Sequence, residues 1–455
     1  MSKMNKKTVA LHNLGCKVNA YETEAMQQMM AEAGFEIVDF SEKADIYIIN
    51  TCSVTNMADR KSRQMLHRAK KQNPEGIVVA VGCYVQTSQA EAREDAAVDI
   101  VIGNNKKHEL IDILQEYIAK RLNGRNEICR RGCEKEGHEG EIETVVPIQN
   151  AREYENLSVT RPGEHTRAFI KVQDGCNQFC SYCIIPYARG RVRSRKLEDV
   201  LLEVNALADH GYQEIVLTGI HLSSYGRDTG EELLDLIRET AKVQGIKRIR
   251  LGSLEPRIVT EGFVRELAEE EKICPHFHLS LQSGCDATLE RMNRKYTTAE
   301  YKESCMILRK YFEHPAITTD VIVGFPGESE EEFLQTKAYL EKIHFYELHV
   351  FKYSRRKGTR AAKMKDQIPE PLKAERSEAL IRLGDKMSEE FREFYLGRET
   401  EALMEEPFQF QGETYYSGYT KEYVKTAVRA ETDISNTLVR GRITGKLQNG
   451  IYLLE

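Results

Sequence analysis

Residues 167–195 read RAFIKVQDGCNQFCSYCIIPYARGRVRSR, a strand-like pattern followed at once by three cysteines and then by alternating arginines. Cys176, Cys180 and Cys183 are spaced so that one loop can present three thiolates together. Three thiolates can hold three irons of a cubane iron–sulfur cluster and leave the fourth iron without a protein ligand. A zinc site would need a fourth ligand nearby, and no Cys or His follows closely. Ordinary buried thiols are the other alternative, but the spacing favours an iron–sulfur loop.

Six short apolar runs between residues 163 and 360 have the composition of β-strands, and each precedes a helical stretch. They are RAFIKVQ, EIVLTGI, RIRLGSL, FHLSLQS, ITTDVIVG and ELHVFKYS. Repeated units of this kind predict a partial βα barrel, whose reactive face lies at the C-terminal ends of its strands. We place this central domain at residues 163–385, with the cysteine loop at its reactive face.

Residues 1–121 alternate β-branched runs with helical patterns, which predicts a parallel sheet with crossover helices. Cys16, Cys52 and Cys83 each follow one of these strand candidates. Because ligands gather outside the carboxyl ends of parallel strands, we expect these cysteines to converge on a second three-thiolate site. Separate burial of each cysteine at a strand end is the alternative.

The remaining segments complete an α/β fold. Residues 122–162 are rich in charge, glycine and asparagine, which is typical of a linker. Residues 386–455 carry short alternating patterns that predict a small all-β barrel. Several cysteines and histidines are not expected to be ligands: Cys129, Cys133, Cys274, Cys285, Cys305, His12 and His138.

The composition excludes several classes of protein. No apolar run among the 455 residues approaches the roughly 20 that span a bilayer, and the first residues lack the pattern of a secretory signal. Eleven cysteines, an odd number, argue against a disulfide framework. The net charge of −6 argues against a surface coated for nonspecific nucleic-acid binding, although one basic groove remains compatible with it. We therefore expect a cytoplasmic protein without a membrane passage.

The cysteine run, with Tyr182 before its last cysteine and a strand before its first, resembles the radical S-adenosylmethionine signature. In that family S-adenosylmethionine chelates the open iron of a [4Fe-4S] cluster, and its reductive cleavage gives a 5′-deoxyadenosyl radical. The resemblance implies that the three cysteines hold this cluster and that Tyr182 lies beside the adenine of the cofactor. It further implies cofactor-binding roles for three residues at strand ends: Gly219 in LTGIHL, Gln282 in LQSG and Gly324 in VIVGFPGE.

The three domains together resemble the methylthiotransferase family, whose third module is the RNA-binding TRAM domain. In that family an N-terminal cluster handles the sulfur for transfer, and a second S-adenosylmethionine is the methyl donor. The resemblance implies two [4Fe-4S] clusters in this chain. Cys16, Cys52 and Cys83 match the ligands of the auxiliary cluster.

The family divides by substrate, and three segments indicate the branch. LHNLGCKVNAYETE, INTCSVTNMADRKSR and GCNQFCSYCIIPYARGRVRSR look most like the enzymes that modify N6-threonylcarbamoyladenosine 37 of tRNA. The implied product carries a methylthio group at C2 of the base, near the anticodon. The alternatives are isopentenyladenosine 37 of tRNA, an aspartate of a ribosomal protein, or a noncatalytic iron–sulfur sensor that binds RNA.

The implied partners are a tRNA anticodon loop, an electron donor such as a flavodoxin and a source of sulfur. We expect the protein itself to be a monomer. Arg189, Arg191, Arg193 and Arg195, if extended, project from one face and are expected to hold RNA phosphates. A solvated loop, or pairing with barrel carboxylates, is the alternative. Weaker RNA-binding candidates are Arg356, Lys357, Arg360, Tyr415, Tyr416, Tyr419 and Tyr423.

Overall fold

The structure is a computed structural model that describes residues 6–122, 143–160, 166–448 and 450–455. Most of the predicted linker, with Cys129, Cys133 and His138, lies outside the described residues. Within the described ranges, none of the helices combines the length and apolar character that a bilayer crossing requires.

The N-terminal domain is a five-stranded parallel sheet in the order β2-β1-β3-β4-β5. Its strands are β1 (Thr8–Asn13), β2 (Glu36–Ile37), β3 (Ile46–Thr51), β4 (Ile77–Gly82) and β5 (Ile100–Ile102). Its helices are α1 (Lys17–Glu32), α2 (Asn56–Gln72), α3 (Cys83–Thr87), α4 (Gln89–Glu94) and α5 (Leu110–Leu122). Helices α1 and α5 pack on one face of the sheet, and α2, α3 and α4 pack on the other. Burial of both faces explains why β3 and β4 are continuous apolar runs, and the predicted parallel sheet is confirmed.

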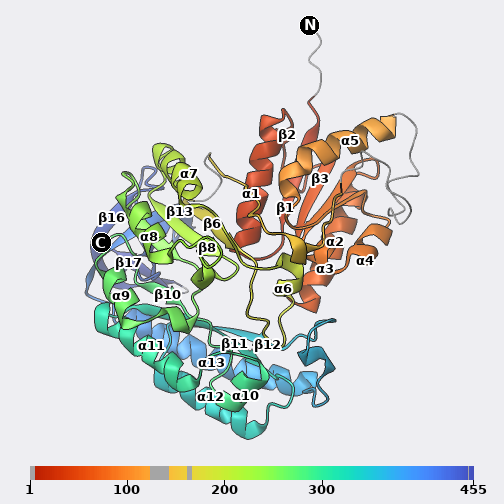
Figure 1. Cartoon of the computed structure of the whole chain (residues 1–455). Coiled ribbons are helices and arrows are strands. Elements are labelled where there is room, and N and C mark those ends of the chain that lie inside the picture. Colours follow the sequence, from red (N-terminus) through yellow and green to blue (C-terminus); the bar gives the residue numbers. More distant parts are fainter. Residues whose placement is uncertain (1–5, 123–142, 161–165, 449) are drawn as a thin grey trace.

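The central domain has six parallel strands in two hydrogen-bonded sheets, joined by isolated parallel bridges beside β9 and β10. The strands are β6 (Arg167–Asp174), β8 (Glu214–Gly219), β9 (Arg248–Leu251), β10 (His276–His278), β11 (Ala316–Val323) and β12 (Glu347–Lys352). A two-residue strand, β7 (Arg193–Ser194), pairs with β6 in the antiparallel sense. The helices are α6 (Ile185–Arg189), α7 (Leu197–Asp209), α8 (Leu233–Lys242), α9 (Glu261–Ala268), α10 (Asp286–Arg291), α11 (Thr298–Tyr311) and α12 (Glu330–Ile343). These strands and helices together form the expected partial βα barrel, with the helices outside the curved sheet (Figure 1).

The C-terminal domain is a closed barrel in the order β13-β14-β15-β17-β16. Its strands are β13 (Glu399–Phe410), β14 (Glu413–Thr420), β15 (Lys425–Arg429), β16 (Leu438–Gln448) and β17 (Ile451–Leu454). Helix α13 (Glu370–Glu393) packs against β12 and leads into this barrel. It continues through residue 385, where we expected the boundary between the two domains.

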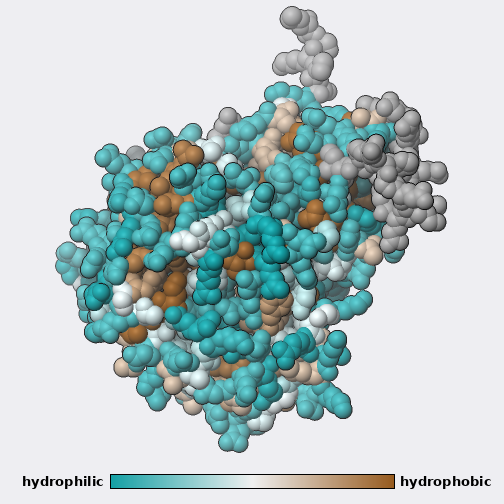
Figure 2. Space-filling view, in the orientation of Figure 1, coloured by the Kyte–Doolittle hydropathy of each residue, from teal (hydrophilic) through white to brown (hydrophobic). Residues whose placement is uncertain are grey.

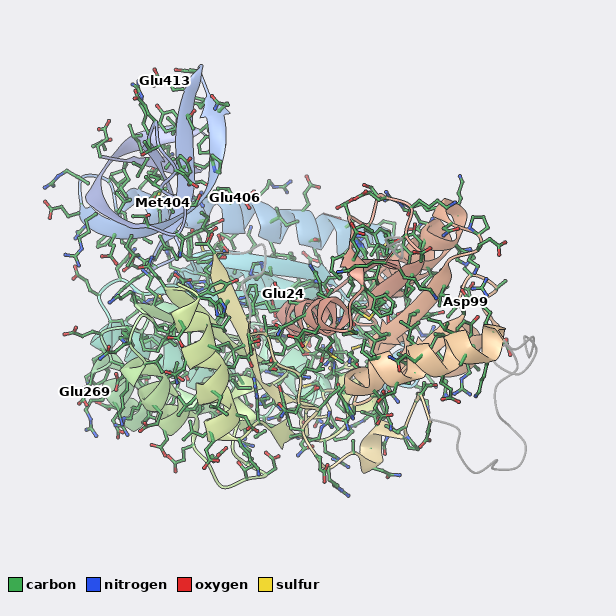
Figure 3. The ribbon with its side chains drawn as sticks, turned by 90° about the horizontal axis from the view of Figure 1, so that it is seen from above. Glu24, Asp99, Glu269, Met404, Glu406 and Glu413 are labelled. Carbon is green, nitrogen blue, oxygen red and sulfur yellow. The ribbon has the colours of Figure 1, made fainter. Side chains whose placement is uncertain are left out.

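The small barrel contacts the N-terminal ends of the central strands. The Arg248 guanidinium donates to the Tyr419 carbonyl at 2.8 Å and to the Glu401 carbonyl at 2.7 Å. Arg167, at the start of β6, donates to the Tyr423 hydroxyl at 2.8 Å. In Figure 3 this barrel, labelled at Met404, lies on one side of the molecule and the N-terminal domain, labelled at Asp99, on the other.

A buried ionic network holds the N-terminal domain on the central barrel. Glu22 of α1 is 0% exposed and accepts from Lys171 of β6 at 2.7 Å and from Arg189 of α6 at 2.5 Å. Lys107 of the N-terminal domain adds a third cation at 3.3 Å. Burial acts to raise the pKa of the Glu22 carboxyl, but Arg189, Lys107 and Lys171 outweigh it and hold that pKa well below its usual range. The face of the molecule in Figure 2 is mostly hydrophilic, as expected for charged side chains in contact with solvent. The charged side chains of this network, in contrast, are buried between two domains.

We predict that Glu22→Gln lowers the stability of the protein by about 3–5 kcal/mol, because it leaves three buried cations without their shared anion. The measurement is thermal unfolding followed by circular dichroism. Glu32→Gln is the matched control, since Glu32 is an exposed carboxylate of the same helix, and it should change stability by less than about 0.5 kcal/mol. Equal effects of the two substitutions would contradict the role given to Glu22.

Candidate functional site

The loop of Cys176, Cys180 and Cys183 follows β6 at the C-terminal end of the central strands. Backbone hydrogen bonds fix its shape: the Cys176 amide donates to the Gly190 carbonyl at 3.0 Å, and the Cys183 amide to the Cys180 carbonyl at 3.0 Å. Gly175 precedes the loop at φ +72°, and a Cβ there would lie 1.8 Å from the Arg191 carbonyl oxygen. The close approach of two backbone segments therefore requires glycine at this position.

The three thiols lie close enough to influence one another. Burial raises the pKa of Cys176 to about 11 and that of Cys183 to about 12, and in each case Cys180 adds to the increase. Arg294 offers a positive charge, because its Nη1 lies 3.3 Å from the Cys180 Sγ. Metal ligation requires deprotonated thiols, so a bound metal and this guanidinium would both favour the thiolates.

This donor set fits a cubane cluster better than a single ion. Among the described residues, no three His, Cys, Asp or Glu side chains converge to hold one metal ion. In a cubane each thiolate binds a different iron, so the thiols need not converge on one point. Three neighbouring free thiols beside a cation therefore suit a [4Fe-4S] cluster with one iron left open.

The expected cofactor-binding residues all lie near the same ends of the strands. Gly219 ends β8, Gly324 directly follows β11, and Gln282 is bridged to Val321 of β11. Tyr182 packs edge-on against Phe325, with ring centroids 6.4 Å apart. Their positions agree with the predicted strand ends, while their roles in binding a cofactor stay predictions.

Cys16, Cys52 and Cys83 lie at the carboxyl ends of three adjacent strands, β1, β3 and β4. Burial raises the pKa of Cys52 to about 11, and both Cys83 and Cys16 add to the increase. A Cβ added to Gly15, the neighbour of Cys16, would lie 3.2 Å from the Cys52 Cβ, so these two strand ends are in close contact. Asn19 ties two of the strand ends together, because its side chain donates to the Leu14 carbonyl at 3.1 Å and to the Thr51 carbonyl at 3.0 Å. The structure thus brings these cysteines together, and the same cubane chemistry suits them.

The expected basic strip is wrong for three of its four arginines. Arg189 ends helix α6 instead of lying in an extended segment, and it is 0% exposed. Arg193 lies 3.6 Å from Asp174, and Arg195 pairs with Glu203; both arginines are buried. These side chains satisfy buried carboxylates, so they do not face RNA. Arg191 alone is exposed, with its guanidinium 4.7 Å from the Phe179 ring centroid.

Three of the weaker RNA-binding candidates, Arg356, Tyr419 and Tyr423, also have partners within the protein. Arg356 is buried and pairs with Asp59 of α2 at 2.7 Å. Tyr423 stacks on Tyr419 at 4.5 Å and on His276 at 4.7 Å, in the contact between the two barrels. Lys357 and Arg360 are exposed, as the prediction for a surface groove requires.

Sequence reasoning missed Arg294 and the contact of Arg189 with a cysteine. The Arg189 Nε lies 3.3 Å from the Cys83 Sγ, although the residues are 106 positions apart. Arg294 is 114 positions from Cys180. No local motif marks either contact, since each arises where separate domains or helices meet.

Two family models match the chain. Residues 170–340 match the radical SAM superfamily, and residues 8–103 match the uncharacterized protein family UPF0004. The first region contains the loop of Cys176, and the second contains the three N-terminal cysteines.

Proteins with curated names are similar over almost the whole chain. The threonylcarbamoyladenosine tRNA methylthiotransferase MtaB of Bacillus subtilis is 43% identical over 96% of this chain and 93% of its own length. The protein of the same name from Aquifex aeolicus is 42% identical, over 90% of this chain and 95% of its own. The tRNA-2-methylthio-N(6)-dimethylallyladenosine synthase of Acetivibrio thermocellus is 34% identical, over 96% and 88%.

Solved structures support the fold alone. The radical S-adenosylmethionine methyltransferase TsrM of Kitasatospora setae matches 77% of this chain and 73% of its own, with a TM-score of 0.55 and 16% identity. This likeness agrees with a central radical SAM barrel.

We predict that Gly175→Ala lowers the iron content of the anaerobically purified protein, because the new methyl group would displace the cysteine loop from the Arg191 carbonyl. Iron analysis, with circular dichroism as a check on folding, measures the effect. Gly211→Ala is the control: Gly211 has a similar φ of +89° but no atom within 4 Å of the added Cβ. Iron loss in both variants, or in neither, would contradict the argument.

Proposed function

The chain belongs to the radical S-adenosylmethionine methylthiotransferase family, and from this premise we propose that it modifies N6-threonylcarbamoyladenosine 37 of tRNA. The product is the 2-methylthio derivative, in which a methylthio group replaces the hydrogen at C2 of the base. The observation that carries the substrate assignment is the 43% and 42% identity to two full-length relatives named for this reaction. The 34% identical relative is named for the dimethylallyl nucleotide, which makes that nucleotide the second candidate.

The match to the radical SAM superfamily implies S-adenosylmethionine and a [4Fe-4S] cluster. We propose that Cys176, Cys180 and Cys183 hold this cluster. When bound, cluster and cofactor supply the radical chemistry that an inert C–H bond of adenine requires. The protein's own part is to hold the thiols on a rigid loop, with Arg294 beside Cys180 and Tyr182 packed behind.

A second [4Fe-4S] cluster is proposed at Cys16, Cys52 and Cys83, where it would handle the sulfur for transfer. Three thiols at adjacent strand ends support this site, and their surroundings supply the Arg189 guanidinium next to Cys83. Two clusters of this kind, each with three cysteine ligands, separate the sulfur step from the radical step in space.

The substrate approaches from solvent as an RNA loop, in which little duplex energy opposes extrusion of the target base. Arg191 is the arginine of the predicted strip that remains exposed next to the cysteine loop, and we propose it as a phosphate contact. Lys357 and Arg360 extend the same proposal to the segment after β12. We further propose a cytoplasmic monomer that receives electrons from a donor such as a flavodoxin and sulfur from a separate source.

Nucleoside mass spectrometry of tRNA tests the substrate. In cells that lack this protein, we expect 2-methylthio-N6-threonylcarbamoyladenosine to disappear and its precursor, N6-threonylcarbamoyladenosine, to accumulate. Restoring the gene should restore the nucleoside. Loss of the 2-methylthio isopentenyl nucleoside instead would transfer the assignment to the second candidate, and unchanged tRNA would refute both.

Replacement of each cysteine triplet by alanine tests the two clusters. We expect about eight irons per chain in the anaerobically reconstituted wild type and about four in either triple variant, because each cubane contributes four. With a strong reductant, only the variant that keeps Cys176, Cys180 and Cys183 should release 5′-deoxyadenosine from S-adenosylmethionine. The control replaces the three cysteines buried in the central domain, Cys274, Cys285 and Cys305, and should retain about eight irons. About four irons in the wild type would show a single cluster.

A further inference from the structure

Two buried arginines connect the N-terminal cysteines with the central cysteine loop. Arg189 ends helix α6, six residues after Cys183, and is 0% exposed. Arg356 follows β12 and is 6% exposed. Both reach from the central domain into the N-terminal domain, so we refer to them as the bridging arginines.

Arg189 joins the two domains beside Cys83. Its Nε lies 3.3 Å from the Cys83 Sγ. Its two terminal nitrogens donate to the Glu22 carboxylate at 2.5 and 3.0 Å, and one also donates to the Asn19 side chain at 2.8 Å. Such a two-pronged contact fixes the orientation of a guanidinium as well as its position. The contacts therefore align the end of α6 with one N-terminal cysteine.

Arg356 makes an equivalent connection beside Cys52. Its guanidinium donates to the Ser53 hydroxyl at 2.8 Å, and to the Asn56 side chain and the Asp59 carboxylate at 2.7 Å each. Ser53 directly follows Cys52 in the chain. The Asn56 side chain returns a bond to the Arg355 carbonyl at 3.1 Å.

The segment that carries Arg356 also holds the central cysteine loop. The Ala361 amide donates to the Ser181 carbonyl at 2.8 Å, and Ser181 lies between Cys180 and Cys183. A short stretch of chain thus contacts the loop of Cys52 at one end and the central loop at the other. Together the bridging arginines connect the two groups of cysteines at two separate points.

Charge burial of this kind is a costly way to join domains, because an ion pair in the interior repays little more than its desolvation. Its benefit is geometric, since a hydrogen-bonded guanidinium tolerates less displacement than an apolar contact. We propose that Arg189 and Arg356 are positioning residues that fix the separation and orientation of the two cluster sites. This separation matters because the radical formed at one site and the sulfur held at the other must both reach the same base. The inference rests on the two clusters of the proposed function.

The first test measures coupling between the two sites. In reconstituted holoenzyme with substrate tRNA, we expect Arg189→Gln and Arg356→Gln to retain wild-type iron and to keep forming 5′-deoxyadenosine. The ratio of 5′-deoxyadenosine to methylthio product should rise about 10- to 100-fold, the range that a displacement near 1 Å produces. Arg189→Lys keeps the charge but loses the two-pronged contact, so its ratio should lie between those of the wild type and Arg189→Gln.

Arg248→Gln is the matched control for coupling. Arg248 is also 0% exposed and also joins two domains, but it contacts the C-terminal barrel and neither group of cysteines. Its ratio should equal that of the wild type. An unchanged ratio in both bridging variants would overturn the inference, as would loss of iron from either, because the residue would then be a structural requirement of its cluster site.

The second test does not depend on turnover. In protein whose Cys176, Cys180 and Cys183 are replaced by alanine, Arg189→Gln should make the reduction potential of the remaining cluster more negative, since a donor to a ligand sulfur is lost. Arg356→Gln should leave the potential unchanged, because its guanidinium contacts no sulfur. The same potential in all three proteins would overturn the role of Arg189. A wild type that yields no methylthio product would instead count against the proposed function, which the two readouts keep distinct.

Discussion

The arrangement of the whole molecule depends on one buried carboxylate, that of Glu22. It pairs with Lys107 of its own domain and with Lys171 and Arg189 of the central domain, and none of these side chains is exposed to solvent. If the N-terminal domain moved away, Lys171 and Arg189 would keep Asp174 as a neighbour but lose the carboxylate they share with Lys107. The interface is therefore close to all-or-none, because a partial separation leaves several charges desolvated and unpaired.

The buried ionic network has more cations than carboxylates, and the excess positive charge lies beside a cysteine. Among its described members four cations face three carboxylates: Lys107, Lys171, Arg189 and Arg193 against Glu22, Asp174 and Glu155. The excess positive charge is adjacent to the Cys83 sulfur through Arg189. A cluster of net negative charge bound at Cys83 would supply the missing anion. The same side chains that join the domains would thus also balance the charge of the proposed auxiliary cluster.

The sequence predicted those features that depend on local spacing or on a general rule of topology. The loop of Cys176 follows from spacing, and the approach of Cys16, Cys52 and Cys83 follows because parallel strands end at one edge of a sheet. Burial of Arg189 was not predictable, since its partner Glu22 is 167 positions away in another domain. The basic strip failed because Arg189 lies in α6, while Arg193 and Arg195 pair with the buried carboxylates of Asp174 and Glu203. Helix α13 runs through residue 385 and packs on the central barrel, so the boundary placed at that residue stays a prediction.

The two ends of the central strands have separate tasks. Their C-terminal ends carry the thiols and the strand-end glycines, while their N-terminal ends contact the small barrel through Arg167, Arg248 and His276. Tyr419 and Tyr423, which sequence reasoning assigned to RNA bases, are used in that contact. Two aromatic residues of this module are therefore used in docking, while Tyr415 stacks within the module on Phe408. Docking at the N-terminal ends keeps the small barrel away from the ends that carry the thiols, in line with the separation of stable and reactive ends in βα barrels.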